Sequence, residues 1–295
     1  VHIRREKSPR VIADEIVRNM QLVISSRQQS FFVGRLAEIT EAQNFFVSTD
    51  NPDPPIVVMF GLEGIGRRTF TLQLARNLFS LQSRLDVPCK AGDGPAEILL
   101  ELETELALLP DGVDVQSRYV ELSAKCLTDL VDSLREILEA ATAKGVLVTL
   151  IDRGGLLNEE GQLHGWCTDL NELLTKSNRA KAAIISMQNP RYDYTVDSIP
   201  IPALRINALP ANDIAVLLKR LFARYNIDAT TDQVRRLSEH VNGYPPAAYF
   251  AARMAAQDGV GMLLNNVQSI QRLTEGRFIR LLEQDKLITE SMKQS

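Results

Sequence analysis

The sequence predicts an α/β fold, in which a parallel sheet carries helices on both faces and is followed by a small all-α helical domain. From residue 56 to about residue 207, short apolar runs alternate with segments of helical periodicity, as in strands joined by crossover helices. The run at 146–151 is apolar and mostly β-branched, which is typical of a strand buried on both faces. After Pro210 the strand signal disappears while helical spacing continues.

Local signals justify the individual elements. The prolines of 51–55 predict a turn before the first strand, and Pro110 with Gly112 predicts the end of a helix. Ser123 is the predicted N-cap of a long helix that ends at Gly145. The predicted strands are 56–60, 85–88, 146–151, 182–185 and 204–206. The predicted helices are 39–45, 70–79, 98–109, 123–144, 170–174, 212–224, 231–240, 245–256, 262–273 and 277–287.

The composition is that of a globular protein of roughly two domains, with 295 residues, 45% of them hydrophobic and 24% charged. A net charge of −4 provides no bulk attraction to nucleic acid or to an anionic membrane, and no apolar run reaches membrane length. The three cysteines and three histidines are scattered without metal-binding spacing, as in a cytoplasmic protein with reduced thiols. Because the chain begins at Val1 rather than Met, we expect it to be part of a longer protein.

Four parts are predicted along the chain. Residues 1–30 are basic and then amphipathic, as in a linker that packs on the neighbouring domain. The α/β domain is predicted at 31–208 and the helical domain at 209–274. Residues 275–295 are predicted to begin a further helical region.

A glycine-rich segment follows the first predicted strand and leads into a helix. Strand, glycine loop and helix in this order are the layout of a phosphate-binding loop, whose pattern is G-x-x-x-x-G-K-[ST]. Gly61 and Gly66 fit the pattern, but Arg67 stands at the lysine position and Arg68 at the hydroxyl position. The residues predicted to contact phosphate are Gly61, Gly64, Ile65, Gly66, Arg67, Arg68, Thr69 and Phe70.

Two polar segments are expected beside this loop. Asp152 follows the strand 146–151, and Ser186-Met-Gln188 follows the strand 182–185. In parallel sheets, ligands bind beyond the carboxyl ends of the strands. We therefore expect the glycine loop, Asp152 and the segment 186–188 to share one edge.

Four motifs stand in a recognisable order: Val33-Gly34-Arg35 with Glu38, the glycine loop, the strand ending in Asp152, and Gly243-Tyr-Pro245 opening a helix. In this order they resemble the STAND class of P-loop signalling NTPases, the NB-ARC and NACHT-like switches, over roughly residues 30–290. The resemblance implies a P-loop NTPase domain and an ARC1-like or lid-like helical domain. It also implies that 275–295 is the truncated start of a winged-helix-like region.

The resemblance implies specific roles for several residues. Val33, Gly34 and Arg35 would lie over the adenine, and Gln188 would read the γ-phosphate. Asp152 would organise Mg²⁺ and water, and would be the catalytic residue of any hydrolysis. Pro245 would bring the helical domain onto the nucleotide.

The departures from the family pattern concern the residues that perform chemistry. Arg68 removes the hydroxyl that binds Mg²⁺, and Arg153 stands where a second acidic residue is common. Thr69 and Asp152 remain as candidate Mg²⁺ ligands, so the sequence indicates no secure metal site. We expect the chain to bind ATP or ADP and to hydrolyse it little or not at all.

The resemblance implies an adenine-nucleotide-binding signal-transduction module, the regulatory core of an antiphage-defence or other signalling protein. We expect it to be cytoplasmic. We expect it to form a homo-oligomer on activation, with effector and sensor domains outside this chain. We expect no membrane or nucleic-acid partner.

Other interpretations stay open. The glycine loop, Gly34-Arg35 and Gly243–Pro245 also fit plain turns, Arg67 and Arg68 also fit exposed arginines of a dead site, and Asp152 also fits a carboxylate capping the next turn. At the level of function, the alternatives are a working ATPase that uses Arg67 and Thr69, and an oligomerisation scaffold that binds no nucleotide. An AAA+-like DNA-binding protein is a third alternative, against which the acidic balance argues.

Overall fold

The computed structural model describes residues 31–47, 54–109, 113–191 and 201–268. These residues divide into two compact units, of which the first comprises Leu36–Glu63 and Arg67–Ile206. The second comprises Phe31–Arg35, Gly64–Gly66 and the chain from Asn207 onward. The predictions for 1–30, 51–53, 110–112 and everything beyond 268 lie outside the described residues.

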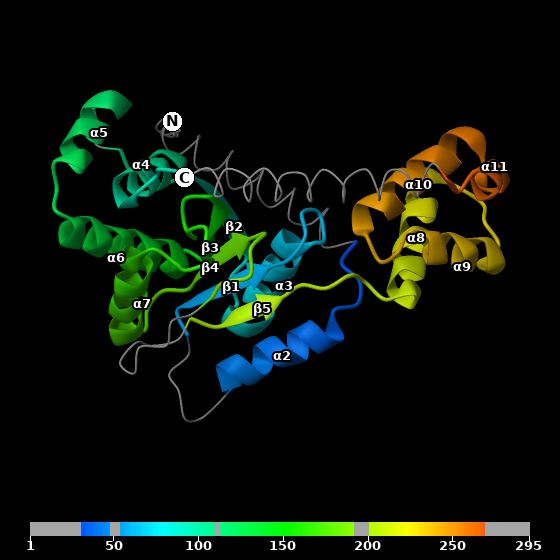
Figure 1. Cartoon of the computed structure of the whole chain (residues 1–295), viewed down its shortest axis with the longest axis horizontal. Helices are drawn as coiled ribbons and strands as arrows, with labels where there is room; N and C mark the ends of the chain where they lie inside the picture. The colour runs from blue at the N-terminus through cyan, green and yellow to red at the C-terminus, as the bar shows by residue number, and fades with distance from the viewer. Residues whose placement is uncertain (1–30, 48–53, 110–112, 192–200, 269–295) are drawn as a thin grey trace, which may run out of the picture. The chain divides into compact units, whose positions relative to one another are not determined.

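The first unit contains the predicted parallel sheet. Its strands are β1 (Ile56–Phe60), β2 (Ser83–Lys90), β3 (Val146–Arg153), β4 (Ala182–Ser186) and β5 (Ala203–Arg205). Every pairing is parallel, and the order is β2-β3-β4-β1-β5 (Figure 1). The register aligns Phe60 with Ser186 and Ile151 with Ile185, so β1, β3 and β4 end at one level. The prediction that these strands share a carboxyl edge is therefore confirmed.

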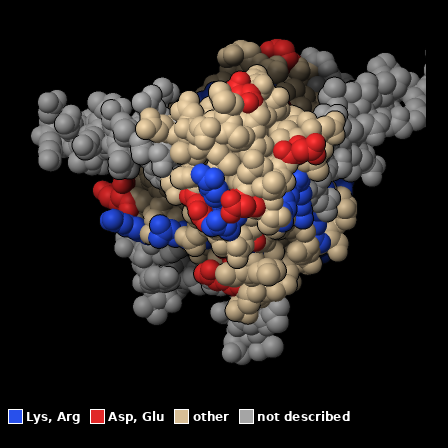
Figure 2. Space-filling model, turned by 90° about the vertical axis from the view of Figure 1, so that its right-hand side faces the viewer, with Lys and Arg blue, Asp and Glu red and all other residues tan. Residues whose placement is uncertain are grey.

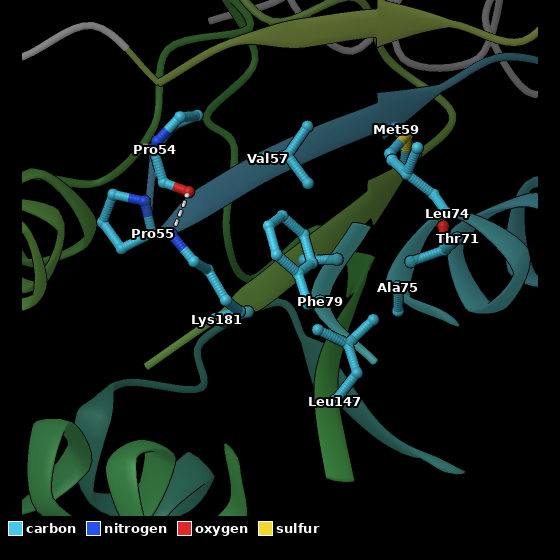
Figure 3. Close-up of a pocket in the computed structure, with 12 residues that line it drawn as sticks. Pro54, Pro55, Val57, Met59, Thr71, Leu74, Ala75, Phe79, Leu147 and Lys181 are labelled. Atoms are coloured by element: carbon cyan, nitrogen blue, oxygen red, sulfur yellow. Dashed lines mark hydrogen bonds between the residues drawn. The ribbon is translucent and has the colours of Figure 1, made fainter. Parts of the chain in front are cut away.

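Helices cover both faces of this sheet. They are α2 (Leu36–Val47), α3 (Arg67–Phe79), α4 (Pro95–Glu105), α5 (Val115–Ser123), α6 (Leu127–Ala143) and α7 (Gly165–Ser177). Alternate residues of β1 face opposite sides, since Ile56 and Val58 join the core that contains α6 and α7. Val57 and Met59 instead line a small cavity with side chains of α3 (Figure 3). The predicted fold class is confirmed by this layering.

The predicted helix from Ser123 to Lys144 is wrong at its start. Ser123 is the last residue of α5, and α6 begins only at Leu127 after the N-cap Cys126. The helix α5 was not predicted, although Asp114 caps it by accepting a 3.0 Å hydrogen bond from Ser117 N. Leu122 is the single buried residue of this short helix.

The second unit is helical, as predicted for the region after Pro210. Its helices are α8 (Ala211–Tyr225), α9 (Thr231–His240), α10 (Pro245–Asp258) and α11 (Val260–Asn265). Helix α10 packs on α8 and α11 through buried alanines, which allow close approach of the backbones. Thr230 and Gln233 form a capping box at the start of α9. Among the described residues, no helix combines the length and apolar composition of a membrane span.

One face of the molecule is shown in Figure 2. Basic and acidic side chains are interspersed there among uncharged ones. Helix α9 has the same mixed character, since Arg235 lies 2.8 Å from both Asp232 and Glu239. Such exposed pairs contribute little to stability, because water screens the charges.

Candidate phosphate-binding site

The glycine loop joins the end of β1 to the start of α3. Its backbone has positive φ at Gly61 (146°), Gly64 (79°) and Gly66 (102°), values that L-residues rarely adopt. Helix α3 begins at Arg67 directly after the loop and has no acidic residue in its first turn. Its first amides and the positive end of its dipole therefore favour an anion. Phe70 is 1% exposed, so it belongs to the core rather than to a binding surface.

Arg67 turns toward the end of β4, where its guanidinium donates a hydrogen bond to the carbonyl oxygen of Ser186. Burial lowers the pKa of Arg67, while the neighbouring Glu63 and Asp152 act in the opposite direction and Arg68 adds to the lowering. A guanidinium stays protonated in proteins. The position of the usual lysine thus holds a partly buried cation that the protein itself already contacts.

Asp152 is occupied by three hydrogen bonds. Its Oδ1 accepts from Gly154 N and from Leu156 N, each at 3.1 Å, and thereby caps the turn after β3. Its Oδ2 accepts from the Ser186 hydroxyl at 2.8 Å. A carboxylate held in this way is fixed in place, and most of its lone pairs are already used.

Ser186 connects these groups; the sequence predicted its place at this edge within 186–188 but indicated no role for it. Its carbonyl accepts from Arg67, its hydroxyl donates to Asp152, and the same hydroxyl oxygen accepts from Gln188 N at 3.0 Å. Gln188 contributes its backbone to this network, and its side chain is exposed. The available signal was that Ser186 is the one polar residue of an otherwise apolar strand, at its carboxyl end.

Arg68 and Thr69 continue the helix away from this network. Arg68 Nε lies 3.5 Å from Asp86 Oδ2 on β2, and its side chain is 50% exposed. Its carbonyl accepts a hydrogen bond from Arg84, which is itself paired with Asp86 at 2.6 Å. Thr69 is partly exposed, and Arg153 is exposed. Within the described ranges, no group of three or more His, Cys, Asp or Glu side chains is placed to hold a metal ion.

In the second unit, Arg35 holds two backbone carbonyls. Its guanidinium donates to Ile65 O at 2.7 Å and to Asn207 O, and the residue is 5% exposed. Arg35 has a positive φ of 68°, and Gly34 before it has a φ of 63°. A Cβ at Gly34 would lie 2.0 Å from Asp213 Oδ2, so only glycine fits there. Val33 is buried.

The Gly243–Pro245 motif packs closely in the same unit. Gly243 has a φ of 72°, and its carbonyl accepts from Leu209 N at 2.9 Å. A Cβ there would lie 2.4 Å from Leu209 O. Pro245 is the first residue of α10. The residues on either side of Pro245 lie close to Gly64, since a Cβ on Gly64 would be 2.8 Å from both Tyr244 Oη and Pro246 Cγ.

The structure therefore brings the predicted residues together in two groups. Arg67, Asp152 and Gln188 meet at Ser186 in the first unit. Gly34, Arg35 and Ile65 lie together in the second. The small cavity of Figure 3 belongs to neither group. Pro54, Pro55 and Lys181 line it and precede β1 and β4, which places it at the opposite edge of the sheet.

Comparison with known proteins gives similarity at the level of structure. No protein-family model matches the sequence, and no curated protein matches it. A Walker-type ATPase of Pyrococcus abyssi has a similar structure, with a TM-score of 0.54, 14% identity, and coverage of 86% of this chain and 76% of that one. A chain of a HORMA, CdnC and Trip13 complex from Escherichia coli is similar as well, with a TM-score of 0.50 and 13% identity, covering 83% of this chain and 91% of that one. Together with the glycine loop and the sheet, these similarities identify the fold as that of a P-loop NTPase.

Proposed function

We propose that this chain is a STAND-type module that binds an adenine nucleotide, ADP or ATP, and hydrolyses it little or not at all. The observation that carries the proposal is a contrast at the carboxyl edge of the sheet. The backbone that would hold phosphate is intact, with its three positive-φ glycines at the start of α3. Arg67 and Asp152, which would perform the chemistry, are both engaged by Ser186.

Hydrolysis depends on stabilising the charge of the transferring phosphoryl group and on positioning the attacking water. Asp152 uses both carboxylate oxygens for internal hydrogen bonds, which leaves it poorly placed to accept a water proton. Arg68 lacks the hydroxyl that would bind Mg²⁺, and its side chain lies beside Asp86. These contacts favour nucleotide binding over turnover.

The order of the four motifs supports a signalling role. In this proposal the nucleotide shifts the balance between two states of the protein, because it binds one of them more tightly, and no turnover is needed. The favoured state assembles into a homo-oligomer in the cytoplasm. Effector and sensor domains outside this chain would then couple assembly to antiphage defence or to another response.

Released nucleotide tests this proposal directly. Purified protein is denatured, and the supernatant is separated by chromatography and compared with ADP and ATP standards. We expect an adenine nucleotide in the supernatant, and phosphate release no faster than that of Asp152→Ala. Mg²⁺-dependent phosphate release that Asp152→Ala abolishes would establish the working ATPase instead. Absence of nucleotide, together with no thermal shift on adding ADP or ATP, would establish the scaffold.

A pair of glycine substitutions controls for folding. Gly66→Asp puts a carboxylate into the loop, where it repels phosphate, and we expect it to abolish nucleotide release. Gly145→Asp is the matched control, since Gly145 also has a positive φ (76°) and a Cβ added there would meet no heavy atom within 4 Å. It precedes β3, at the opposite edge of the sheet. Equal nucleotide content in both variants would contradict a phosphate site in this loop.

A further inference from the structure

We infer that this site takes the nucleotide without a divalent cation, and that the Arg67 guanidinium supplies the positive charge that a metal would otherwise provide. This inference rests on the proposed nucleotide binding. It starts from the surroundings of Asp152, where the structure places a protein cation rather than a set of metal ligands. Arg67 and Asp152 both contact Ser186, and the two side chains lie close enough to interact electrostatically.

The oxygen donors of this edge do not fit Mg²⁺. That ion requires a near-octahedral set of oxygen ligands and keeps several of its waters. A carboxylate offers about four lone-pair sites, and Asp152 already uses three for Gly154 N, Leu156 N and the Ser186 hydroxyl. A metal would find a single free lone pair on this carboxylate, close to the positively charged Arg67.

Two positions where the family pattern places a metal-binding side chain hold arginines here. Arg68 carries no side-chain oxygen, and its cation lies beside Asp86. Arg153, directly after Asp152, brings a further positive charge instead of a second carboxylate. Each of these charges opposes the entry of a divalent cation.

Arg67, by contrast, fits a polyphosphate. It is the first residue of α3, directly after the loop, where the free amides of the helix also favour an anion. A guanidinium carries several N–H donors in a planar fork suited to phosphate oxygens, and Ser186 O takes one of them. The Ser186 carbonyl therefore holds the cation in place while leaving donors for a ligand. Partial burial strengthens its attraction to an anion, because little water screens the pair.

Calorimetric titration of nucleotide-free protein with ADP, in Mg²⁺ and in EDTA, tests the inference. We expect the dissociation constant for ADP in EDTA to lie within about threefold of its value in Mg²⁺, or to be lower than that value. A loss of about tenfold or more in EDTA would overturn the inference while leaving nucleotide binding intact. Failure of ADP and ATP to bind under both conditions would overturn the proposed function itself.

Substitution of Arg67 adds a second readout. We expect Arg67→Ala to weaken ADP binding in EDTA by about tenfold or more, and Arg67→Lys to recover part of that loss because it keeps the charge. Arg179→Ala is the matched control, since Arg179 is exposed and precedes β4 at the opposite edge of the sheet. Unchanged ADP affinity in Arg67→Ala would contradict the role given to Arg67. The comparison of Mg²⁺ with EDTA uses the unmodified protein and does not depend on how the variants fold.

Discussion

The hydroxyl of Ser186 donates a 2.8 Å hydrogen bond to Asp152 Oδ2, which ties the end of β4 to the end of β3. The two strands are neighbours in the sheet, and their register places these residues at the same edge. Ser186 is fully buried while Asp152 is partly exposed, so this contact forms at the boundary between the core and the carboxyl edge of the sheet. The Asp152 carboxylate is therefore a structural acceptor in this protein before any ligand is considered.

Replacing Ser186 should lower the stability of the folded protein. Ser186→Ala removes the donor to Asp152 and leaves a carboxylate oxygen with one partner fewer, so we expect the free energy of unfolding to fall by about 1–3 kcal/mol. Urea denaturation measures this change. Ser133→Ala is the control, since Ser133 is partly exposed on α6 and its hydroxyl donates to the helix carbonyl of Asp129. Equal stability of the two variants would show that the Ser186–Asp152 contact contributes nothing.

Arg35 allows side-chain contacts to be separated from backbone strain. Arg35→Ala removes the donors to Ile65 O and Asn207 O, and we expect it to cost about 2–3 kcal/mol. Arg35→Gly removes the same donors but accepts the positive φ of 68°, so it should be more stable than Arg35→Ala by about 1 kcal/mol. Thermal unfolding of both variants checks the order. Greater stability of Arg35→Ala would contradict strain at this position.

The lowered pKa of Glu97 predicts that the folded protein loses stability in acid. Burial raises the pKa of Glu97, but hydrogen bonds from the Tyr119 hydroxyl at 2.7 Å and from Gly94 N at 2.8 Å outweigh it and hold the pKa below its ordinary value. A lowered pKa in the folded state means that this stabilisation is present above the ordinary glutamate pKa of about 4.3 and is lost as the pH falls below it.

Tyr119→Phe should reveal this contribution. At neutral pH we expect it to lower the free energy of unfolding by about 1 kcal/mol, and the difference from the unmodified protein should shrink as the pH falls below about 4. Urea unfolding across this pH range measures it. Tyr225→Phe, on an exposed residue of α8, should show no such pH dependence. A Tyr119→Phe deficit that stays constant with pH would exclude the charged Glu97 as its cause.

Two glycines with similar φ values separate steric conflict from backbone strain. Gly243 and Gly259 have φ values of 72° and 83°, but a Cβ at Gly243 would lie 2.4 Å from Leu209 O, whereas a Cβ at Gly259 meets nothing within 4 Å. Gly259→Ala should cost about 1 kcal/mol from strain alone. Gly243→Ala should cost clearly more, since the backbone at Leu209 must move. Equal unfolding midpoints of the two variants in urea would show that the structure accommodates a Cβ at Gly243 without a steric cost.

Much of the fold could be predicted because its signals are local. The run at 146–151 forms β3, and the glycines of 61–66 adopt the positive φ values that a tight loop requires. The division between α5 and α6 could not be found in this way. Ser123 has the residue type of an N-cap but ends α5, whereas the N-cap of α6 is Cys126, whose residue type gives no capping signal.

The candidate site, too, could be predicted from the sequence only in part. The sequence alone determined that a phosphate-type loop enters a helix, and that arginines replace the residues of phosphoryl transfer. Only the tertiary structure decided that Arg67 reaches Ser186, 119 residues away, and that Arg35 reaches Asn207, 172 residues away. Backbone conformation and periodicity follow from neighbours in the chain, whereas a long guanidinium takes whichever acceptors the fold brings within reach.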